Sequence, residues 1–210
     1  MDLTTMRTRL RRDLRDEDAV NYRWTDAELD RHIGRAVGEV SLAAPLEATA
    51  TLLTTAGNRE LSATALASRV SIDTAEYPTG QYPPALVPFT TWGDTIALLI
   101  DGEPRAGDAV LVRYSQLHTL DAAGTTLPDR LHDLVATGAA AYAALEWASF
   151  ATNRVNVGGA ETWRNYHTWA QERMAAFAKT LAKLGRERRL RGHRMFSPAV
   201  SVRPRSVDSQ

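Results

Sequence analysis

The sequence reads LPDRLHDLVATGAAAYAAL from Leu127 to Leu145, and this segment predicts the helix around which the rest of the chain is organised. Pro128 suits the first turn of a helix, where a missing N–H leaves no hydrogen bond unmade. Apolar residues then recur at helical spacing, and the many Ala and Gly residues allow neighbouring elements to approach closely. We therefore expect a tightly packed central helix. Its predicted apolar stripe is Leu131, Leu134, Val135, Gly138, Tyr142 and Leu145.

Two helices are expected on the N-terminal side of this segment. Between Asp2 and about Asp18, apolar residues recur every three or four positions among charged ones, which predicts an amphipathic helix. Thr25 and Glu28 have the spacing of a capping box, which predicts the start of a second helix that ends before Pro45. The apolar positions are Leu3, Met6, Leu10 and Leu14 in the first helix, and Leu29, Ile33, Val37 and Val40 in the second.

A long final helix is expected from about Ala160 to Arg191, after the chain break predicted by Asn156-Val157-Gly158-Gly159. At 1.5 Å per residue it is ~45 Å long, so it either projects beyond the body or forms an edge against another subunit. Its apolar positions alternate at spacings of three and four, as in a coiled coil. They are Trp163, Tyr166, Ala170, Met174, Phe177, Leu181 and Leu184.

The segment between the N-terminal helices and the central helix has a different composition. From Thr49 to about Thr119, helical periodicity disappears and Thr, β-branched residues, Pro and Gly become frequent. This predicts three or four strands in a small antiparallel sheet or barrel. The expected strands run near Thr49 to Thr55, Arg69 to Asp73, Thr95 to Ile100 and Ala109 to Ser115.

The predicted fold class is therefore α+β and mainly α. It is a helical bundle with a long C-terminal helix, an inserted small antiparallel β sheet or barrel, and a flexible C-terminal tail. The expected division is residues 1–48 for the N-terminal helices, 49–120 for the β domain, 121–194 for the C-terminal helices and 195–210 for the arm. Pro198 and Pro204, among polar residues, favour an arm that is unstructured on its own.

The formal net charge is zero, which argues against a protein that coats nucleic acid through its overall charge. The charge is nevertheless uneven along the chain. From Lys179 to the end there are nine basic and two acidic residues, so this segment carries +7 and the rest carries −7. The asymmetry indicates a basic arm that meets an acidic or phosphate-bearing surface, or another copy of the chain. Alternatively, the cations complement the dipole of the final helix and a solvated tail follows.

The sequence offers little support for catalysis, and we expect no catalytic, cofactor-binding or metal-binding residues. The chain has no cysteine, which excludes thiol chemistry and Cys-ligated zinc. Phosphate-cradling and nucleophile-elbow motifs are absent, and the five histidines are scattered. Asp129, His132 and Asp133 resemble an acid/base group, but carboxylates in a first helical turn are explained by the helix dipole. Capping explains Asp26, Glu28 and Asp30 in the same way.

The aromatic residues of the final helix could stack on nucleic-acid bases, but Trp163 and Tyr166 fall on the apolar stripe and are expected in the core. Trp169 lies off that stripe, so it is the candidate for a contact between subunits. No apolar run approaches the ~20 residues of a membrane span, and the charged N-terminus has no signal-peptide character. We therefore expect no membrane partner and a protein that stays in the cytoplasm where it is made.

The order of these segments resembles that of phage head-to-tail connector adaptors. The resemblance covers Met1 to about Arg194 and lies in pattern and order more than in one short motif. Its most specific part is the aromatic-Thr-Asp-x-Glu-Leu start of the second helix, here Trp24 to Leu29. It also includes YPTGQYPPALVPFTTW (Tyr77 to Trp92) and GDAVLVRYSQLHTL (Gly107 to Leu120). The large β insertion is similar to that of the tail tubular proteins of short-tailed phages.

This resemblance implies a non-enzymatic virion protein at the head-to-tail junction, made in the host cytoplasm. It implies a homo-oligomeric ring, usually of twelve copies, beneath the portal, with genomic DNA passing through the lumen without sequence-specific binding. A stopper or tail protein would lie below the ring. The C-terminal segment would dock on the portal, and the matching residues here are Arg186, Arg188, Arg189, Arg191, Arg194, Met195 and Phe196.

Two other function classes remain open on the sequence alone. One is a nucleic-acid-binding protein that uses the same basic arm, although the neutral charge and the lack of a recognisable groove-reading module argue against it. The other is an enzyme of unrecognised type, which no motif supports.

Overall fold

The computed structural model describes residues 1–151 and 162–192, with side chains as far as Arg188, and it has an α+β fold with a long C-terminal helix. The predicted break at Asn156 to Gly159 and the predicted tail lie outside these residues. The helices within the described ranges are α1 (Leu3–Leu14), α2 (Asp26–Ala43), α3 (Asp129–Ala151) and α4 (Thr162–Gly192). The strands are β1 (Leu46–Leu53), β2 (Glu60–Ser62), β3 (Arg69–Glu76), β4 (Leu86–Val87), β5 (Phe89–Trp92), β6 (Thr95–Leu98) and β7 (Ala109–Gln116).

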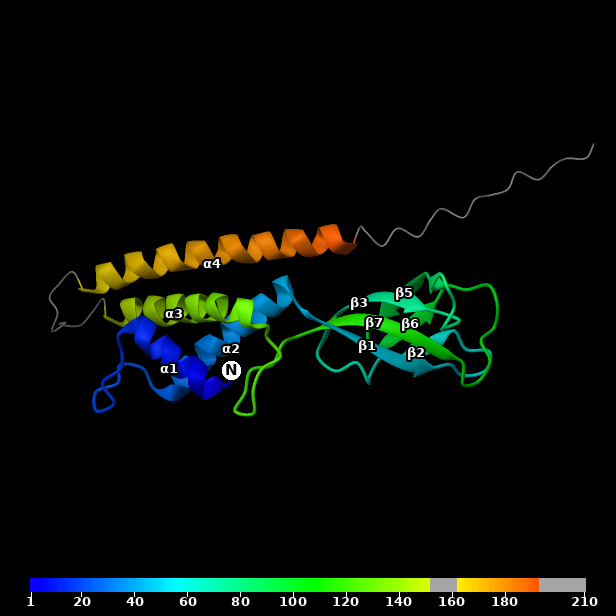
Figure 1. Cartoon of the computed structure of the whole chain (residues 1–210), viewed down its shortest axis with the longest axis horizontal. Coiled ribbons are helices and arrows are strands. Elements are labelled where there is room, and N and C mark those ends of the chain that lie inside the picture. The colour runs from blue at the N-terminus through cyan, green and yellow to red at the C-terminus, as the bar shows by residue number, and fades with distance from the viewer. Residues whose placement is uncertain (152–161, 193–210) are drawn as a thin grey trace, which may run out of the picture.

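Helix α3 lies in the middle of the helical part, as the Leu127–Leu145 segment predicts. Helix α4 runs antiparallel along one side of it, α1 and α2 pack against it from the other, and α2 also contacts α4 (Figure 1). Nearly every position of α3 from Val135 to Ala144 is buried, because a helix with neighbours on both sides has no solvent face. Small side chains keep the three layers close together.

Helices α3 and α4 approach each other closely at Gly138 of α3. A Cβ atom at this position would lie 2.7 Å from both Cε2 and Cζ of Phe177 on α4. Phe177 is only 1% exposed, and its ring meets Tyr142 edge to face with 6.3 Å between centroids. The ring therefore fills the space that a larger residue at position 138 would need.

The β part contains two antiparallel sheets that face each other. One has the strand order β1-β7-β3-β4 and the other β2-β6-β5. Side chains between the sheets form a core of their own, which includes Leu61, Ile96 and Val112. Alternation along β1 directs Ala50 and Leu52 inward and Thr49 and Thr51 outward, which is the period of a half-buried strand.

The helical and β parts lie end to end, each with its own hydrophobic core (Figure 1). Among the described residues, contacts between a helix and a strand are sparse. The chain passes between the parts at Ala44–Pro45 and again after β7. The second connection is held by His118, whose ring nitrogens lie 3.0 Å from the Ala44 carbonyl and 3.1 Å from the Thr126 hydroxyl. The parts are therefore joined by a narrow, hydrogen-bonded connection.

Candidate functional site

The basic end of α4 lies beside the β part, at the junction between the two cores (Figure 1). Of the predicted portal-docking residues, Arg186 is exposed and Arg188 is partly buried. Arg189 and Arg191 are in the last turn of the helix, but their side chains are not described, and Arg194, Met195 and Phe196 lie beyond the described residues. Cations in this position complement the negative end of the helix dipole.

Arg188 is bound by the chain's own β sheet. Its Nη2 donates hydrogen bonds to the Ser71 hydroxyl at 3.0 Å and to the Ser115 hydroxyl at 2.9 Å. The same nitrogen lies 3.6 Å from Oδ1 of Asp73. The sequence pattern groups Arg188 with a free basic arm and does not reveal this contact, because the two serines are 117 and 73 residues away along the chain.

The sheet brings these three acceptors together through its register. Ser71 of β3 is paired directly with Ser115 of β7, and both face away from the β core. Register shifts on either side of Ser71, typical of β-bulges, leave Asp73 between Ile72 and Thr74 without a partner on β7. The surface around Arg188 is hollowed into a groove of about 950 Å³, which Thr49 and Arg113 also line.

Trp169, the predicted subunit contact, is partly buried against the helical core. The guanidinium of Arg173 lies 4.4 Å from the centre of its ring, and Arg173 in turn hydrogen-bonds Asp13 of α1 at 3.3 Å. Part of the Trp169 ring is therefore already covered by Arg173 of the same chain. Tyr166 also packs against the helical core, as its place on the apolar stripe predicts, with its ring 4.6 Å from that of Trp147.

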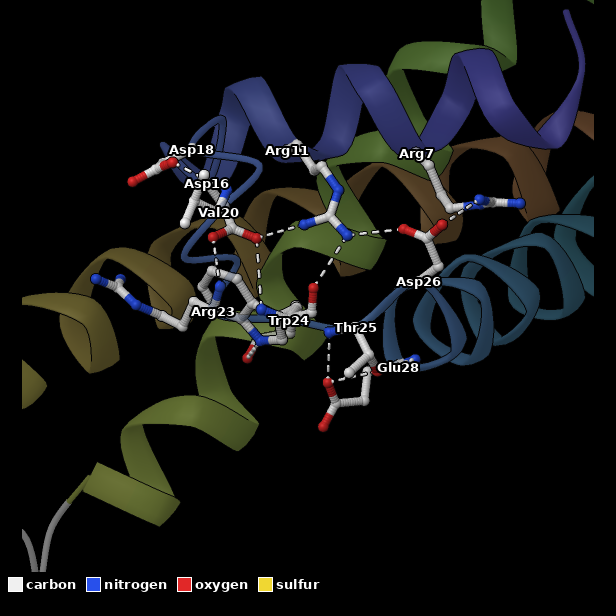
Figure 2. Close-up of polar contacts among 11 residues, drawn as sticks. Arg7, Arg11, Asp16, Asp18, Val20, Arg23, Trp24, Thr25, Asp26 and Glu28 are labelled. Carbon is white, nitrogen blue, oxygen red and sulfur yellow. Dashed lines mark hydrogen bonds and ion pairs between the residues drawn. The ribbon is translucent and has the colours of Figure 1, made fainter.

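A buried polar network fixes the connection between α1 and α2, and no sequence motif indicates it. Figure 2 shows Arg11 between the carboxylates of Asp16 and Asp26, at 2.6 and 2.7 Å. Arg11 also donates to the Trp24 carbonyl at 3.0 Å, while Asp16 accepts from the Arg23 backbone N–H at 2.6 Å. Arg11 and Asp16 are each 6% exposed, so these bonds replace bonds to water that burial removes.

The side chain of Arg23, in the same α1–α2 connection, contacts aromatic residues of α3 and α4. Its guanidinium lies 4.7 Å from the ring centre of Trp147, 5.1 Å from that of Tyr166 and 5.5 Å from that of Trp24. It also donates a hydrogen bond to the Tyr166 hydroxyl. One cation thus joins the α1–α2 loop to α3 and α4 through aromatic faces.

Several titratable groups of the helical part have shifted pKa values with structural causes. A hydrogen bond from Arg11 lowers the pKa of Asp26, and the backbone N–H of Thr25 lowers the pKa of Glu28 at the start of α2. Burial lowers the pKa of His32, which lies 3.1 Å from Glu146. Burial, followed by a hydrogen bond to Glu39, raises the pKa of Tyr142 to about 12. These shifts accompany helix capping and helix packing.

Asp129 lies in the first turn of α3, as the dipole argument requires, whereas Asp133 lies beyond that turn and pairs with Arg9 of α1. Nδ1 of His132 is 3.6 Å from Asp129, and Nε2 is 3.2 Å from the Leu127 carbonyl at the start of α3. Within residues 1–151 and 162–192, no cluster of three or more His, Cys, Asp or Glu residues could hold a metal ion. Over the same ranges, the helices do not combine the length and apolarity that crossing a membrane requires.

Comparison with known proteins gives a family but no curated relative. No curated protein matches the chain. Among solved structures, similar chains occur in the neck of an empty gene transfer agent particle (14% identity, TM-score 0.29, 80% of this chain and 88% of that chain). Another occurs in the virion of a native gene transfer agent particle (18% identity, TM-score 0.31, 80% and 88%). The assignment rests instead on the family model described as SU10 adaptor protein, which matches residues 1–203.

This match spans nearly the whole chain and confirms the resemblance to head-to-tail adaptors that the order of the segments indicates. The protein belongs to the SU10 adaptor protein family and is a structural adaptor of a virion rather than an enzyme.

Proposed function

We propose that the protein is a ring-forming subunit of a phage neck, that twelve copies assemble beneath the portal, and that the ring extends the DNA channel toward the tail. The family match over residues 1–203 carries this proposal. The end-to-end arrangement of two separate cores supports it, since such a subunit can offer different surfaces to the proteins above and below it. The four helices would pack side by side as a bundle around the ring, with Trp169 at the contact between neighbours.

The basic arm would dock on the portal, and the β domain would face a stopper or tail protein. Docking would use Arg186, Arg189, Arg191, Arg194, Met195 and Phe196, and Arg188 could join only by leaving Ser71 and Ser115. Guanidinium groups suit such a surface because they pair with carboxylates in a planar, two-bond geometry. The DNA in the lumen would be passed without sequence-specific contacts.

Particle assembly with charge-reversed arms tests this proposal. The variant Arg189→Glu/Arg191→Glu should leave the isolated protein folded but reduce its incorporation into particles. The matched control Lys179→Glu/Lys183→Glu makes the same charge change two to three turns earlier on α4, where both lysines are exposed, and it should assemble normally. Equal incorporation of both variants would remove the arm from portal docking.

Imaging of particle necks tests the location and copy number independently. Antibody-bound gold should label the head-to-tail junction, and averaged neck images should show twelve subunits. Absence of the protein from particles, with an antibody that recognises disrupted material, would overturn the neck role. A steep fall of DNA affinity with salt in the isolated protein would instead favour the nucleic-acid-binding alternative.

A further inference from the structure

The outer face of the four-stranded sheet carries a preorganised binding site for one guanidinium group. Oδ1 of Asp73 accepts a hydrogen bond from the Ser71 hydroxyl at 3.0 Å, and Oδ2 accepts one from the Ser115 hydroxyl at 2.7 Å. Each serine has a single hydroxyl proton, so donation to Asp73 leaves only oxygen lone pairs for other partners. Both serines therefore act as acceptors toward Arg188, the donor that the structure places there.

The geometry of this site is set by the sheet rather than by Arg188. Ser115 is 1% exposed, and its pairing with Ser71 across the β3–β7 ladder sets the distance between the two hydroxyls. The irregular register of β3 brings the Asp73 carboxylate alongside both of them. Arg188 enters from the helical part and bonds both strands of this ladder at once.

The rest of the junction offers little to hold the two parts in one orientation. A groove of about 410 Å³ lies between them, lined by Leu46 on the strand side and by Leu184 and Arg188 on the α4 side. The hydrophobic cores of the described residues do not merge across it. Among the described residues, the relative orientation of the two parts therefore rests on the connection at Ala44–Pro45, on the connection of residues 117–128 with its His118 hydrogen bonds, and on the Arg188 contact.

We propose that Arg188 is a latch that fixes the β part against the end of α4, and that its receptor is the Ser71, Asp73 and Ser115 triad. The latch belongs to the isolated chain and does not depend on the proposed portal docking. Because Arg188 belongs to the basic end of α4, any partner that binds its guanidinium also releases the β part. The arm and the β part are in this way mechanically coupled through one side chain.

Distance measurement between two spin labels tests the latch in the full chain. The sequence has no cysteine, so Gln171→Cys on α4 and Thr51→Cys on β1, both exposed, can be labelled without background. The labelled chain with Arg188 and Asp73 intact should give one narrow distribution of distances between the two labels. Arg188→Gln should lower the ratio of latched to unlatched chains roughly fivefold, since both partners of this charge-assisted contact are partly solvent-exposed.

Two further variants make the result specific. Arg186→Gln removes the same charge from an exposed neighbour on α4 and should leave the distribution unchanged. Asp73→Asn should broaden it, and Arg188→Gln/Asp73→Asn should broaden it no further than either single change, because both disable one contact. A distribution for Arg188→Gln as narrow as that of the parent, or additive effects in the double variant, would overturn the latch.

Discussion

Substitution of Gly138 by Ala gives the most direct test of how α3 and α4 pack. In a helix interior this change alone favours folding by about 1 kcal/mol, because Ala loses less backbone freedom. Here, however, the new Cβ would lie 2.7 Å from two ring atoms of Phe177, whereas carbon atoms normally approach to about 3.5–4.0 Å. The ring must retreat by about 1 Å, yet Phe177 is 1% exposed and abuts Tyr142. Overpacking of this kind costs about 1–3 kcal/mol, which offsets the gain and leaves a net destabilisation of up to about 2 kcal/mol.

Gly34→Ala is the matched control, since this glycine also lies inside a helix but a Cβ there would meet nothing within 4 Å. Gly34→Ala should stabilise the protein by about 0.5–1 kcal/mol. Urea unfolding followed by helical circular dichroism measures both variants. In a Phe177→Leu background, Gly138→Ala should no longer destabilise, because the smaller side chain leaves room. If Gly138→Ala stabilises the wild-type chain as much as Gly34→Ala does, α3 and α4 are not as close at Gly138 as the contact with Phe177 requires.

Further substitutions test the polar contacts of the helical part. Arg11→Met leaves Asp16 buried without its cation and should cost about 3 kcal/mol in urea unfolding, whereas an unchanged midpoint would contradict the buried network in Figure 2. Thr25→Ala removes the hydroxyl of the capping box and should cost about 1 kcal/mol by the same assay. Because the pKa of Glu28 is lowered in the folded state, its stabilisation is complete above its ordinary value of 4.5 and is lost as pH falls below it. Glu28→Gln should therefore flatten the acid limb of a stability profile. Because the pKa of Tyr142 is raised to about 12, its phenol should be absent from the ionisation near pH 10 in an alkaline absorbance titration, and Tyr142→Phe should remove the late component.

Local signals were sufficient to predict the helices of the described residues, although α1 ends at Leu14, where Arg15 adopts a left-handed conformation, rather than near Asp18. The capping box at Thr25 and Glu28 forms in both directions, with the hydroxyl and the carboxylate each accepting a backbone N–H. Helix α3 begins at Asp129, directly after the proline that favours a first turn. Such features depend on residues three or four positions apart, so the sequence displays them without any knowledge of the fold.

Short and irregular strands were harder to predict. The sequence indicated the segments that form β1, β3, β6 and β7, although β1 begins at Leu46 rather than Thr49. Strands β2 and β4 have three and two residues, which is too few to show an alternating pattern. Strand β5 has four residues, but its last three are all exposed, so it shows no alternation. Their place in the sheets is set by pairing with distant strands, and pairing partners cannot be inferred from local composition.

The number of basic residues near the C-terminus does not show which of them are free to bind a partner. The nine basic residues from Lys179 onward would all be free to bind a partner only if none of them met the body of the protein. Arg188 does meet it, and Asp73 lies against its guanidinium within the chain. A substitution at Arg188 should therefore act first on the orientation of the β part, whereas a substitution at Arg186, which is exposed on the same helix, should act only on what the arm binds. The two proposals thus give different roles to two arginines that the sequence groups together: Arg188 in the latch and Arg186 in docking.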